Sequence, residues 1–516
     1  MKKTVITVTL LLVGILLFCL LASCAKTNCE HEYVKTVVQP TCTEDGADVY
    51  TCTRCDDSYQ NVIESTGNEH DYVDGRCEHC GEFSNIPQYT LNADGMGYTL
   101  TGIGGFRGGE LVVDTYNGLP VTGIGENALY RCDNLISVIL CDGVTEIGEA
   151  AFGFCPALTG VTLSEGITGI GDAAFRGCTA LEEIVIPDGV VDIGDRAFEG
   201  CSALSGVTLS NGVRSIGNYA FQNCSRLSKI IIPDGVRNVG EAVFKDCTSL
   251  TSVTIGSSIT SISTSMFQGC RALASIIIPN NVTSIGDSAF ARCTSLTDVT
   301  LGNGVKTIYY KAFHGSGIVS IVIPNGVTIL GGSVFYECTD LVSVVIADSV
   351  TSLGSWAFFG CTSLTRVTLG TGVKRIQEGA FYNCTALAGI NIPRGVNFID
   401  DQAFYGCASL LGVTLPDGLT EIRTNTFAYC TSLTSIGIPD GVTKICESAF
   451  RGCTSLTSVV IGGDVKTIYQ YAFMGCSDLQ SIKYRGTSDE WSGISKKYWW
   501  DHGTGGYAVI CDYTGE

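Results

Sequence analysis

Apolar side chains recur along this chain with a period of 23 residues, from Val121 to Thr487. One unit runs from Ile167 to Gly189 and reads ITGIGDAAFRGCTALEEIVIPDG. Sixteen such units follow one another, and one of them, Val305 to Gly326, is a residue shorter. Phe occupies the ninth position in fifteen units, with Leu129 as the exception, and Cys the twelfth position in fifteen, with Ser316 as the exception. A fixed period of this length predicts a solenoid, in which each coil buries its apolar face on its neighbours.

Each unit contains two apolar segments that predict different local structures. The first, such as Leu204 to Leu209, follows the pattern L-x-x-[VI]-x-[IL], whose alternation and β-branched residues are typical of a strand. A turn follows, and Gly ends eleven of the sixteen units, which suits a backbone position with positive φ. The second segment turns inward, and the pattern x-x-A-F-x-x-C predicts a short helical turn that places Phe in the core. The stacked strands of sixteen units form a parallel sheet with a spacing of about 4.8 Å, roughly 75 Å long.

The recurrent Leu, Phe and Cys positions resemble the leucine-rich repeat of BspA-like (treponemal-type) bacterial surface proteins, and the resemblance extends over all sixteen units. It implies a right-handed α/β solenoid, a leucine-rich-repeat horseshoe of sixteen 23-residue coils with a parallel sheet. It also implies an exported protein with a role in adhesion to host matrix proteins or to other cells. The adhesive role rests on the resemblance alone.

Both ends of the solenoid, residues 121–487, have segments that fit caps. Residues 84–120 form the predicted N-terminal cap, with a strand pair between Tyr89 and Val113. Residues 488–516, which contain Trp491, Trp499 and Trp500, resemble the closing segment of the family. An uncapped solenoid would expose its last apolar face and a sheet edge.

The first 23 residues read as a secretory signal that ends in a lipidation site. Two lysines precede an apolar run from about Val5 to Leu21, and small residues then precede Cys24. This ending resembles a bacterial lipobox, which implies cleavage before Cys24 and attachment of a lipid to its sulfur. The alternative is an uncleaved membrane anchor, because about 18 apolar residues nearly span a bilayer. We expect a lipid-anchored protein on the extracytoplasmic side of a bacterial cell membrane.

A small Cys/His-rich module, residues 24–83, follows the signal. Its pairs C-x-x-C are spaced like two zinc knuckles, so we predict a structural zinc ion held by four cysteines: Cys52, Cys55, Cys77 and Cys80. A second, less specific site can be drawn from Cys29, His31, Cys42 and His70. The competing interpretation is disulfide bonds, since small exported modules usually rely on them.

Charge and residue usage exclude several classes of function. The chain holds 31 Lys and Arg against 51 Asp and Glu, a net charge of −20, which argues against nucleic acid as a partner and against membrane contact other than through the lipid. The repeated cysteines are predicted to be small buried hydrophobes. After residue 83 the chain has two histidines, His314 and His502, so a nucleophilic triad has almost no base. We predict that the protein is not an enzyme.

Two surfaces remain as candidates for binding an extracellular protein or glycan. The first is the outer face of the strands, where small polar residues interleave with Val and Ile at Thr162, Thr208, Thr254, Thr300 and Thr368. The alternative for this face is strand propensity alone. The second is a file of aromatic residues: Tyr336, Phe359, Tyr382 and Tyr405, with Trp356 nearby. The alternative for the aromatic file is packing between coils. The leading hypothesis is an adhesin or ligand-capture protein, and the second is a stalk or envelope scaffold without a specific ligand.

Overall fold

The structure of the chain is a computed structural model that describes residues 87–104 and 106–515 in full. Before residue 87 it describes the backbone of five strands. Three of them, β1 (Tyr33–Val38), β2 (Ala47–Cys52) and β3 (Ser58–Val62), form an antiparallel sheet in the order β1-β2-β3. The other two, β4 (Tyr72–Val73) and β5 (Arg76–Cys77), pair with each other.

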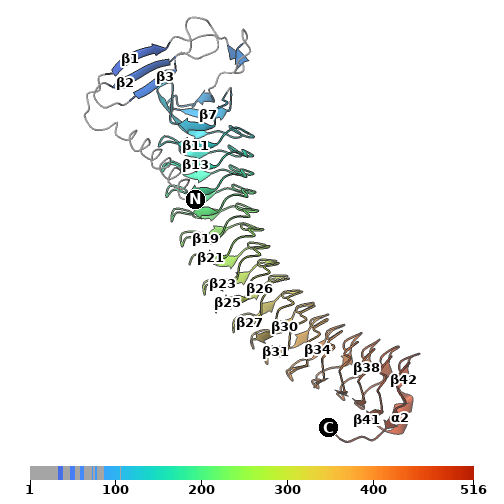
Figure 1. Cartoon of the computed structure of the whole chain (residues 1–516). Coiled ribbons are helices and arrows are strands. Elements are labelled where there is room, and N and C mark those ends of the chain that lie inside the picture. Colours follow the sequence, from blue (N-terminus) through green and yellow to red (C-terminus); the bar gives the residue numbers. More distant parts are fainter. Residues whose placement is uncertain are drawn as a thin grey trace, which may run out of the picture.

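From residue 87 onward the chain winds into a long solenoid whose coils stack side by side (Figure 1). The predicted solenoid with a parallel sheet is confirmed. One strand of each coil belongs to a first sheet, whose hydrogen-bonded pairing is interrupted between some coils, for example between β17 and β19. The alternation of its residues is as predicted: in β15, Ile184 is 2% exposed and Val185 is 64% exposed. The strands of the first sheet are β8 (Glu110–Val113), β11 (Ser137–Leu140), β13 (Gly160–Thr162), β15 (Glu183–Val185), β17 (Gly206–Thr208), β19 (Lys229–Ile231), β21 (Ser252–Thr254), β23 (Ser275–Ile278), β25 (Asp298–Leu301), β27 (Ser320–Ile323), β29 (Ser343–Ile346), β31 (Arg366–Thr368), β33 (Gly389–Ile390), β35 (Gly412–Val413), β37 (Ser435–Ile438), β39 (Ser458–Ile461), β41 (Ser481–Tyr484) and β43 (Ala508–Ile510).

The second apolar segment of each unit forms a second parallel sheet, which the sequence pattern did not predict. Its strands are mostly two residues long, and the second residue points into the core, as Ile170 does. They are β7 (Tyr98–Gly102), β10 (Leu119–Ile124), β12 (Glu146–Ile147), β14 (Gly169–Ile170), β16 (Asp192–Ile193), β18 (Ser215–Ile216), β20 (Asn238–Val239), β22 (Ser261–Ile262), β24 (Ser284–Ile285), β26 (Thr307–Ile308), β28 (Ile329–Leu330), β30 (Ser352–Leu353), β32 (Arg375–Ile376), β34 (Phe398–Ile399), β36 (Glu421–Ile422), β38 (Lys444–Ile445), β40 (Thr467–Ile468) and β42 (Ser495–Lys496).

The third side of each coil consists of turns, where we predicted a short helical turn. Alternate amides donate to carbonyl oxygens of the next coil, Phe152 N to Ala174 O at 2.7 Å and Phe154 N to Arg176 O at 2.6 Å. The amides between them donate within their own coil, as Gly153 N does to Ala150 O at 2.9 Å. The seventh and eleventh residues of the unit have positive φ, 48° at Ala150 and 57° at Phe154. This alternation of backbone handedness points every second amide along the solenoid axis and prevents helix formation. Within the described residues, the helix is α2 (Ser488–Gly493), which follows the sixteenth unit.

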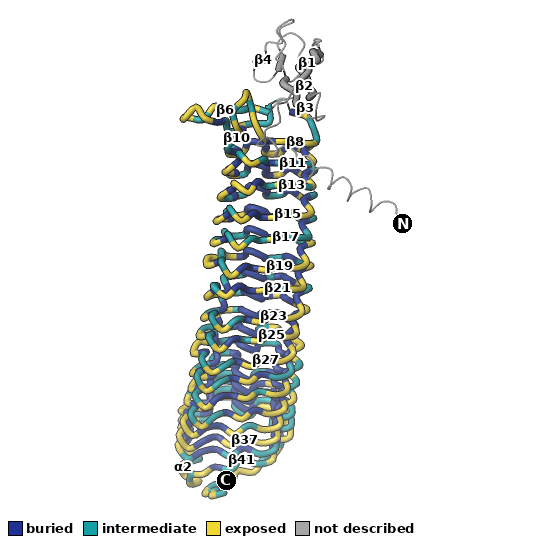
Figure 2. Tube along the Cα trace, turned by 90° about the vertical axis from the view of Figure 1, so that its left-hand side faces the viewer, coloured by how far each residue is buried: buried dark blue, intermediate teal, exposed yellow. Residues whose placement is uncertain are grey.

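The core consists of columns of identical side chains that run along the axis. The fifteen Phe rings from Phe152 to Phe473 stack with centroids 5.1–5.6 Å apart and interplanar angles of 1–14°. The predicted burial of the repeated cysteines is confirmed, since those from Cys155 to Cys476 are 0% exposed. Figure 2 shows the buried positions as a continuous strip inside an exposed rim. Neighbouring coils therefore provide most of each coil's apolar contacts.

The glycines that end the units are required because neighbouring coils approach each other closely at this position. Our expectation that these glycines have positive φ is wrong. A Cβ atom at Gly189 would lie 2.6 Å from the carbonyl oxygen of Glu165 in the preceding coil. One at Gly212 would overlap the carbonyl oxygen of Asp188. The glycines with positive φ stand instead at the eleventh position, for example Gly177 at 70° and Gly200 at 75°.

Both sheets continue for one coil beyond the sixteen units at each end. At the N-terminal end, β7 and β8 join the two sheets, and β6 (Gln88–Leu91) pairs antiparallel with β7, as the expected strand pair. The short β9 (Thr115–Tyr116) pairs with β10. At the C-terminal end, β42 and β43 extend the two sheets, and Trp500 lies edge-on to Phe473 at 6.0 Å. The helix α2 lies between β41 and β42, and its N-cap Thr487 forms a capping box, whose hydrogen bonds to the Glu490 carboxylate lower the pKa of that side chain.

Candidate functional site

The outer face of the first sheet carries a row of β-branched side chains, which we call the strand-face row. Parallel register pairs members of neighbouring coils within each part of the sheet, as Val185 pairs with Thr208 and Ile231 with Thr254. The row consists of Thr162, Val185, Thr208, Ile231, Thr254, Ile277, Thr300, Val322, Val345 and Thr368, so it contains the five threonines named as candidates.

The strand-face row exposes large apolar side chains to solvent. Val185 is 64% exposed, Ile231 63%, Ile277 70% and Val322 62%. From Thr162 to Val322 these residues alternate with threonine, which keeps the same β-branched shape and supports the same kind of strand. Strand formation therefore does not require Val or Ile at these positions, because threonine would support the strand equally well. A file of exposed apolar groups that folding does not demand is typical of an interaction surface.

The four aromatic candidates form a stacked column on a different side of the coils, which we call the aromatic row. Its ring centroids are 4.4 Å apart between Tyr336 and Phe359, 5.0 Å between Phe359 and Tyr382, and 4.4 Å between Tyr382 and Tyr405. The interplanar angles are 8°, 16° and 4°. Trp356 lies 5.6 Å from both Phe359 and Tyr382, so the structure brings all five candidates together.

Within the aromatic row, Phe359 and Tyr382 have both flat faces covered by neighbouring rings, and Tyr336 and Tyr405 have one face covered. All four rings and Trp356 are half-buried, and burial together with the neighbouring Tyr382 raises the pKa of the Tyr405 hydroxyl. A ring whose two faces contact other rings offers a ligand its edge and little stacking area. This geometry favours packing between coils over glycan stacking in the aromatic row.

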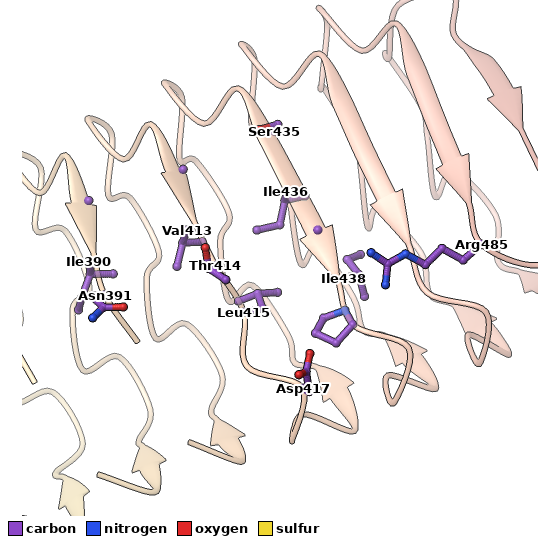
Figure 3. A pocket seen from close by; sticks show the side chains of 14 residues that line it. Ile390, Asn391, Val413, Thr414, Leu415, Asp417, Ser435, Ile436, Ile438 and Arg485 are labelled. Atoms are coloured by element: carbon purple, nitrogen blue, oxygen red, sulfur yellow. The ribbon is translucent and has the colours of Figure 1, made fainter. Parts of the chain in front are cut away.

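A shallow hollow of about 880 Å³ lies on the first sheet near its C-terminal end (Figure 3). Its floor includes three glycines, Gly389, Gly412 and Gly437, and Asp417 and Arg485 lie at the side where the strands lead into turns. A Cβ atom at any of the three glycines would meet no other atom within 4 Å, so packing does not require glycine there. The repeat pattern did not single out these residues, although glycines inside the predicted strands were the signal that could have found them.

Comparison with known proteins decides the family. The chain matches the family described as "BspA type Leucine rich repeat region (6 copies)" over residues 118–227, 191–319, 306–433 and 397–493, which together cover more than half of the chain. The chain belongs to the BspA-type leucine-rich repeat family. Members of this family are proteins of the bacterial cell surface.

Solved structures of other leucine-rich repeat proteins resemble this BspA-type chain. A leucine-rich repeat protein from Bacteroides ovatus is 28% identical, with a TM-score of 0.63 over 82% of this chain and 98% of the other. A leucine-rich cell surface protein from Faecalibacterium prausnitzii is 26% identical, with a TM-score of 0.37 over 84% of this chain and 99% of the other. The pneumococcal vaccine antigen PcpA is 14% identical, with a TM-score of 0.42 over 94% of this chain and all of the other. No protein with a curated description matches the chain in sequence.

The column of cysteines in this BspA-type solenoid is inert rather than catalytic. From Cys155 to Cys476, each thiol of the column donates to a carbonyl oxygen in the preceding coil, as Cys178 Sγ does to Phe152 O at 3.0 Å and Cys224 Sγ to Phe198 O at 3.2 Å. Burial raises the pKa of Cys201 and of Cys407 to about 12. Because the thiolate is the nucleophile, thiols with such pKa values are unreactive at neutral pH.

The candidates in the N-terminal part of the BspA-type chain lie outside the described residues. These are Cys24, the four predicted zinc ligands Cys52, Cys55, Cys77 and Cys80, and the second set Cys29, His31, Cys42 and His70; of these, Cys52 and Cys77 end the described backbone of β2 and β5. Structural zinc and lipidation stay predictions. In the part of the chain that the structure describes, no group of His, Cys, Asp or Glu is placed to hold a metal ion, and no helix has the length and apolarity to cross a membrane.

Proposed function

We propose that this BspA-type protein binds an extracellular protein through the strand-face row and is held at the cell surface by a lipid on Cys24. The observation that supports the binding site is the exposure of Val185, Ile231, Ile277 and Val322, each more than 60% exposed. Burying apolar area of this kind against a partner contributes about 25 cal/mol per Å². The single charges beside the row, such as Glu183, Lys229 and Asp298, add selectivity for partners of complementary charge.

A protein is the ligand that this surface fits best. Its exposed groups are methyl-bearing side chains and threonine hydroxyls on a regular sheet, and no aromatic residue belongs to the row. Glycan sites usually place an aromatic ring against the sugar, whereas the core of a protein interface is apolar and poor in charge.

The test replaces the four apolar members of the strand-face row by threonine. Val185→Thr, Ile231→Thr, Ile277→Thr and Val322→Thr together keep the β-branched shape that suits the strand. In binding to immobilised collagen, laminin, fibrinogen and fibronectin, we expect the quadruple variant to lose at least about tenfold in affinity for the protein that the wild type binds, because apolar contacts at an interface core are lost. The melting temperature should remain nearly unchanged, since these side chains are exposed in the unbound protein.

The matched control is the quadruple change of Tyr336, Phe359, Tyr382 and Tyr405 to serine in the aromatic row. We expect this variant to lose stability and to retain affinity at temperatures where it is folded. The opposite result, lost binding at unchanged stability, would move the site to the aromatic row. Binding of the wild type to none of the four proteins would favour the alternative of a stalk without a specific ligand.

The lipid anchor is tested by Cys24→Ser in the full-length protein. We expect the variant to leave the membrane fraction or to remain as an unprocessed precursor, because lipid attachment needs the thiol of that cysteine. Membrane association and precursor processing identical to those of the wild type would rule out lipidation. The readout is fractionation of cells followed by mass spectrometry of the N-terminal peptide.

A further inference from the structure

A row of exposed cations runs along the second sheet of this strongly acidic protein. At the second and third positions of the sixteen units, the chain holds seven Lys or Arg and three Asp or Glu, whereas the whole chain holds 31 and 51. The seven, which we call the basic row, are Arg214, Arg237, Lys306, Lys374, Arg375, Lys444 and Lys466, and all are exposed. Residues at these positions precede or begin β18, β20, β26, β32, β38 and β40, so the cations lie along one side of the solenoid.

The charges of the basic row are not neutralised by the protein's own carboxylates. Among the described residues, the ion pairs within 4.0 Å involve Arg176, Arg196, Arg423 and Arg485, and none involves the basic row. The single acidic residue at these two positions between Arg214 and Lys466 is Glu421, which pairs with Arg423 at 2.6 Å. In a chain with 51 carboxylates, a row of cations that form no ion pair keeps a positive potential that attracts anions.

The basic row is densest at β32. Lys374 and Arg375 are adjacent, and the ammonium group of Lys374 extends over Gly395, the residue after the exposed Arg394. The guanidinium of Arg375 lies 3.9 Å from the ring centroid of Phe398 in the next coil, which holds it in place. Three cations thus gather from one coil with no carboxylate partner within 4.0 Å in the described part of the chain. Such a cluster matches the carboxylate or sulfate groups of a ligand.

We propose that the basic row binds a linear anionic polysaccharide that carries carboxylate or sulfate groups. Four of the seven cations, Arg237, Lys306, Lys374 and Lys444, stand at three-coil intervals, which correspond to about 14 Å at the spacing of a parallel sheet. An extended polymer with charges on some of its sugars matches such sparse cations. Duplex DNA has one charge per roughly 1.7 Å, so its dense charge would be repelled by the net charge of −20.

The residues between the cations also suit a sugar rather than a base. Threonine fills the second position in most intervening coils. The hydroxyl of Thr283 in one of these coils, and that of Thr443 beside Lys444, donate to carbonyl oxygens of the preceding coil at 3.0 and 3.2 Å. Their oxygen lone pairs remain available to accept from sugar hydroxyls. Phe398 is the one aromatic residue at these two positions, and Arg375 and Arg423 lie over its ring, at 3.9 and 5.2 Å, so it offers no platform for stacking a base.

The experiment measures binding of the full-length protein to four polymers: alginate with carboxylates, heparin with sulfates, uncharged dextran and single-stranded DNA. The test variant carries Lys306→Gln, Lys374→Gln, Arg375→Gln and Lys444→Gln. The control variant removes the same charge from other sides of the coils through Arg226→Gln, Lys245→Gln, Arg271→Gln and Arg292→Gln. Melting temperatures of both variants establish that they are folded.

We expect binding to alginate, heparin or both that weakens with salt, and a loss of at least about tenfold in the test variant at low ionic strength. The control variant should stay within about twofold of the wild type. Whichever of the two anionic glycans binds more tightly identifies the charged group. Equal losses in both variants, equal binding of dextran, or tighter binding of DNA than of either anionic glycan would overturn the proposal. Because the strand-face row is intact in both variants, these outcomes do not depend on the function proposed above.

Discussion

Replacing Phe358 by alanine should lower the free energy of unfolding by about 3–5 kcal/mol, because the substitution leaves a cavity in the phenylalanine column. The Phe358 side chain is 0% exposed and stacks between Phe335 at 5.3 Å and Phe381 at 5.2 Å. Neither neighbour can fill the space, since each is held by the next ring of the column. Urea unfolding followed by circular dichroism measures the loss as a shift of the midpoint.

The next residue in the chain provides the matched control. Phe359 belongs to the aromatic row, is half-buried and stacks on Tyr336 at 4.4 Å and on Tyr382 at 5.0 Å. The same change to alanine should lower the free energy of unfolding by about 1 kcal/mol, since solvent can enter the space that the ring leaves. Equal losses at the two positions would mean that the aromatic row is as important for stability as the buried column.

Gly212→Ala is expected to destabilise the solenoid by about 3 kcal/mol or more, through the steric overlap of one added carbon atom. The new Cβ would overlap the carbonyl oxygen of Asp188. Backbone atoms on both sides belong to stacked coils, so neither can move without breaking hydrogen bonds between coils. The measurement is the shift in melting temperature of the single variant.

Gly160→Ala tests whether the loss of stability in Gly212→Ala comes from the close approach of neighbouring coils or would follow the replacement of any glycine. Gly160 lies in β13 with a φ that is not positive, and its Cβ would meet no atom within 4 Å. Alanine there should change the free energy of unfolding by less than about 1 kcal/mol, and in the stabilising direction, because the unfolded chain loses freedom. A comparable loss at both positions would contradict the close approach of the coils at their turns.

The solenoid could be predicted from the sequence because its core positions are singled out by residue type. Leu204, Phe221 and Cys224 belong to columns in which each residue meets a copy of itself, so the chain repeats the same choice in every unit. Residue types alone could not show whether the third side of each coil forms a helical turn. The pattern A-F-x-x-C fits a helix and the observed turns equally well, and positive φ at residues such as Ala150 and Arg196 leaves no clear mark in the sequence.

The sequence predicted where the side chains of the candidate site lie, but not which of the two rows is more exposed to solvent. The pattern placed Thr208 and Thr254 on the outer face of the strands, where the structure has them. That Ile277 exposes more apolar surface than any ring of the aromatic row depends on how adjacent coils cover each other. A sequence with a period of 23 residues shows which residues are neighbours, but not whether two rings such as Tyr382 and Tyr405 stack face to face.

The hydrogen bonds between coils, in both sheets and in the turns, point along the axis of the solenoid, as the bond from Phe152 N to Ala174 O does. A force that pulls the two ends apart therefore acts on these bonds in tension and opens them one coil at a time, starting at an end. Each coil that opens replaces a rise of about 4.8 Å by the contour of its 23 residues, roughly 75 Å when fully extended. We expect the chain to lengthen under load in steps of nearly equal size, which would limit the tension on a bound partner.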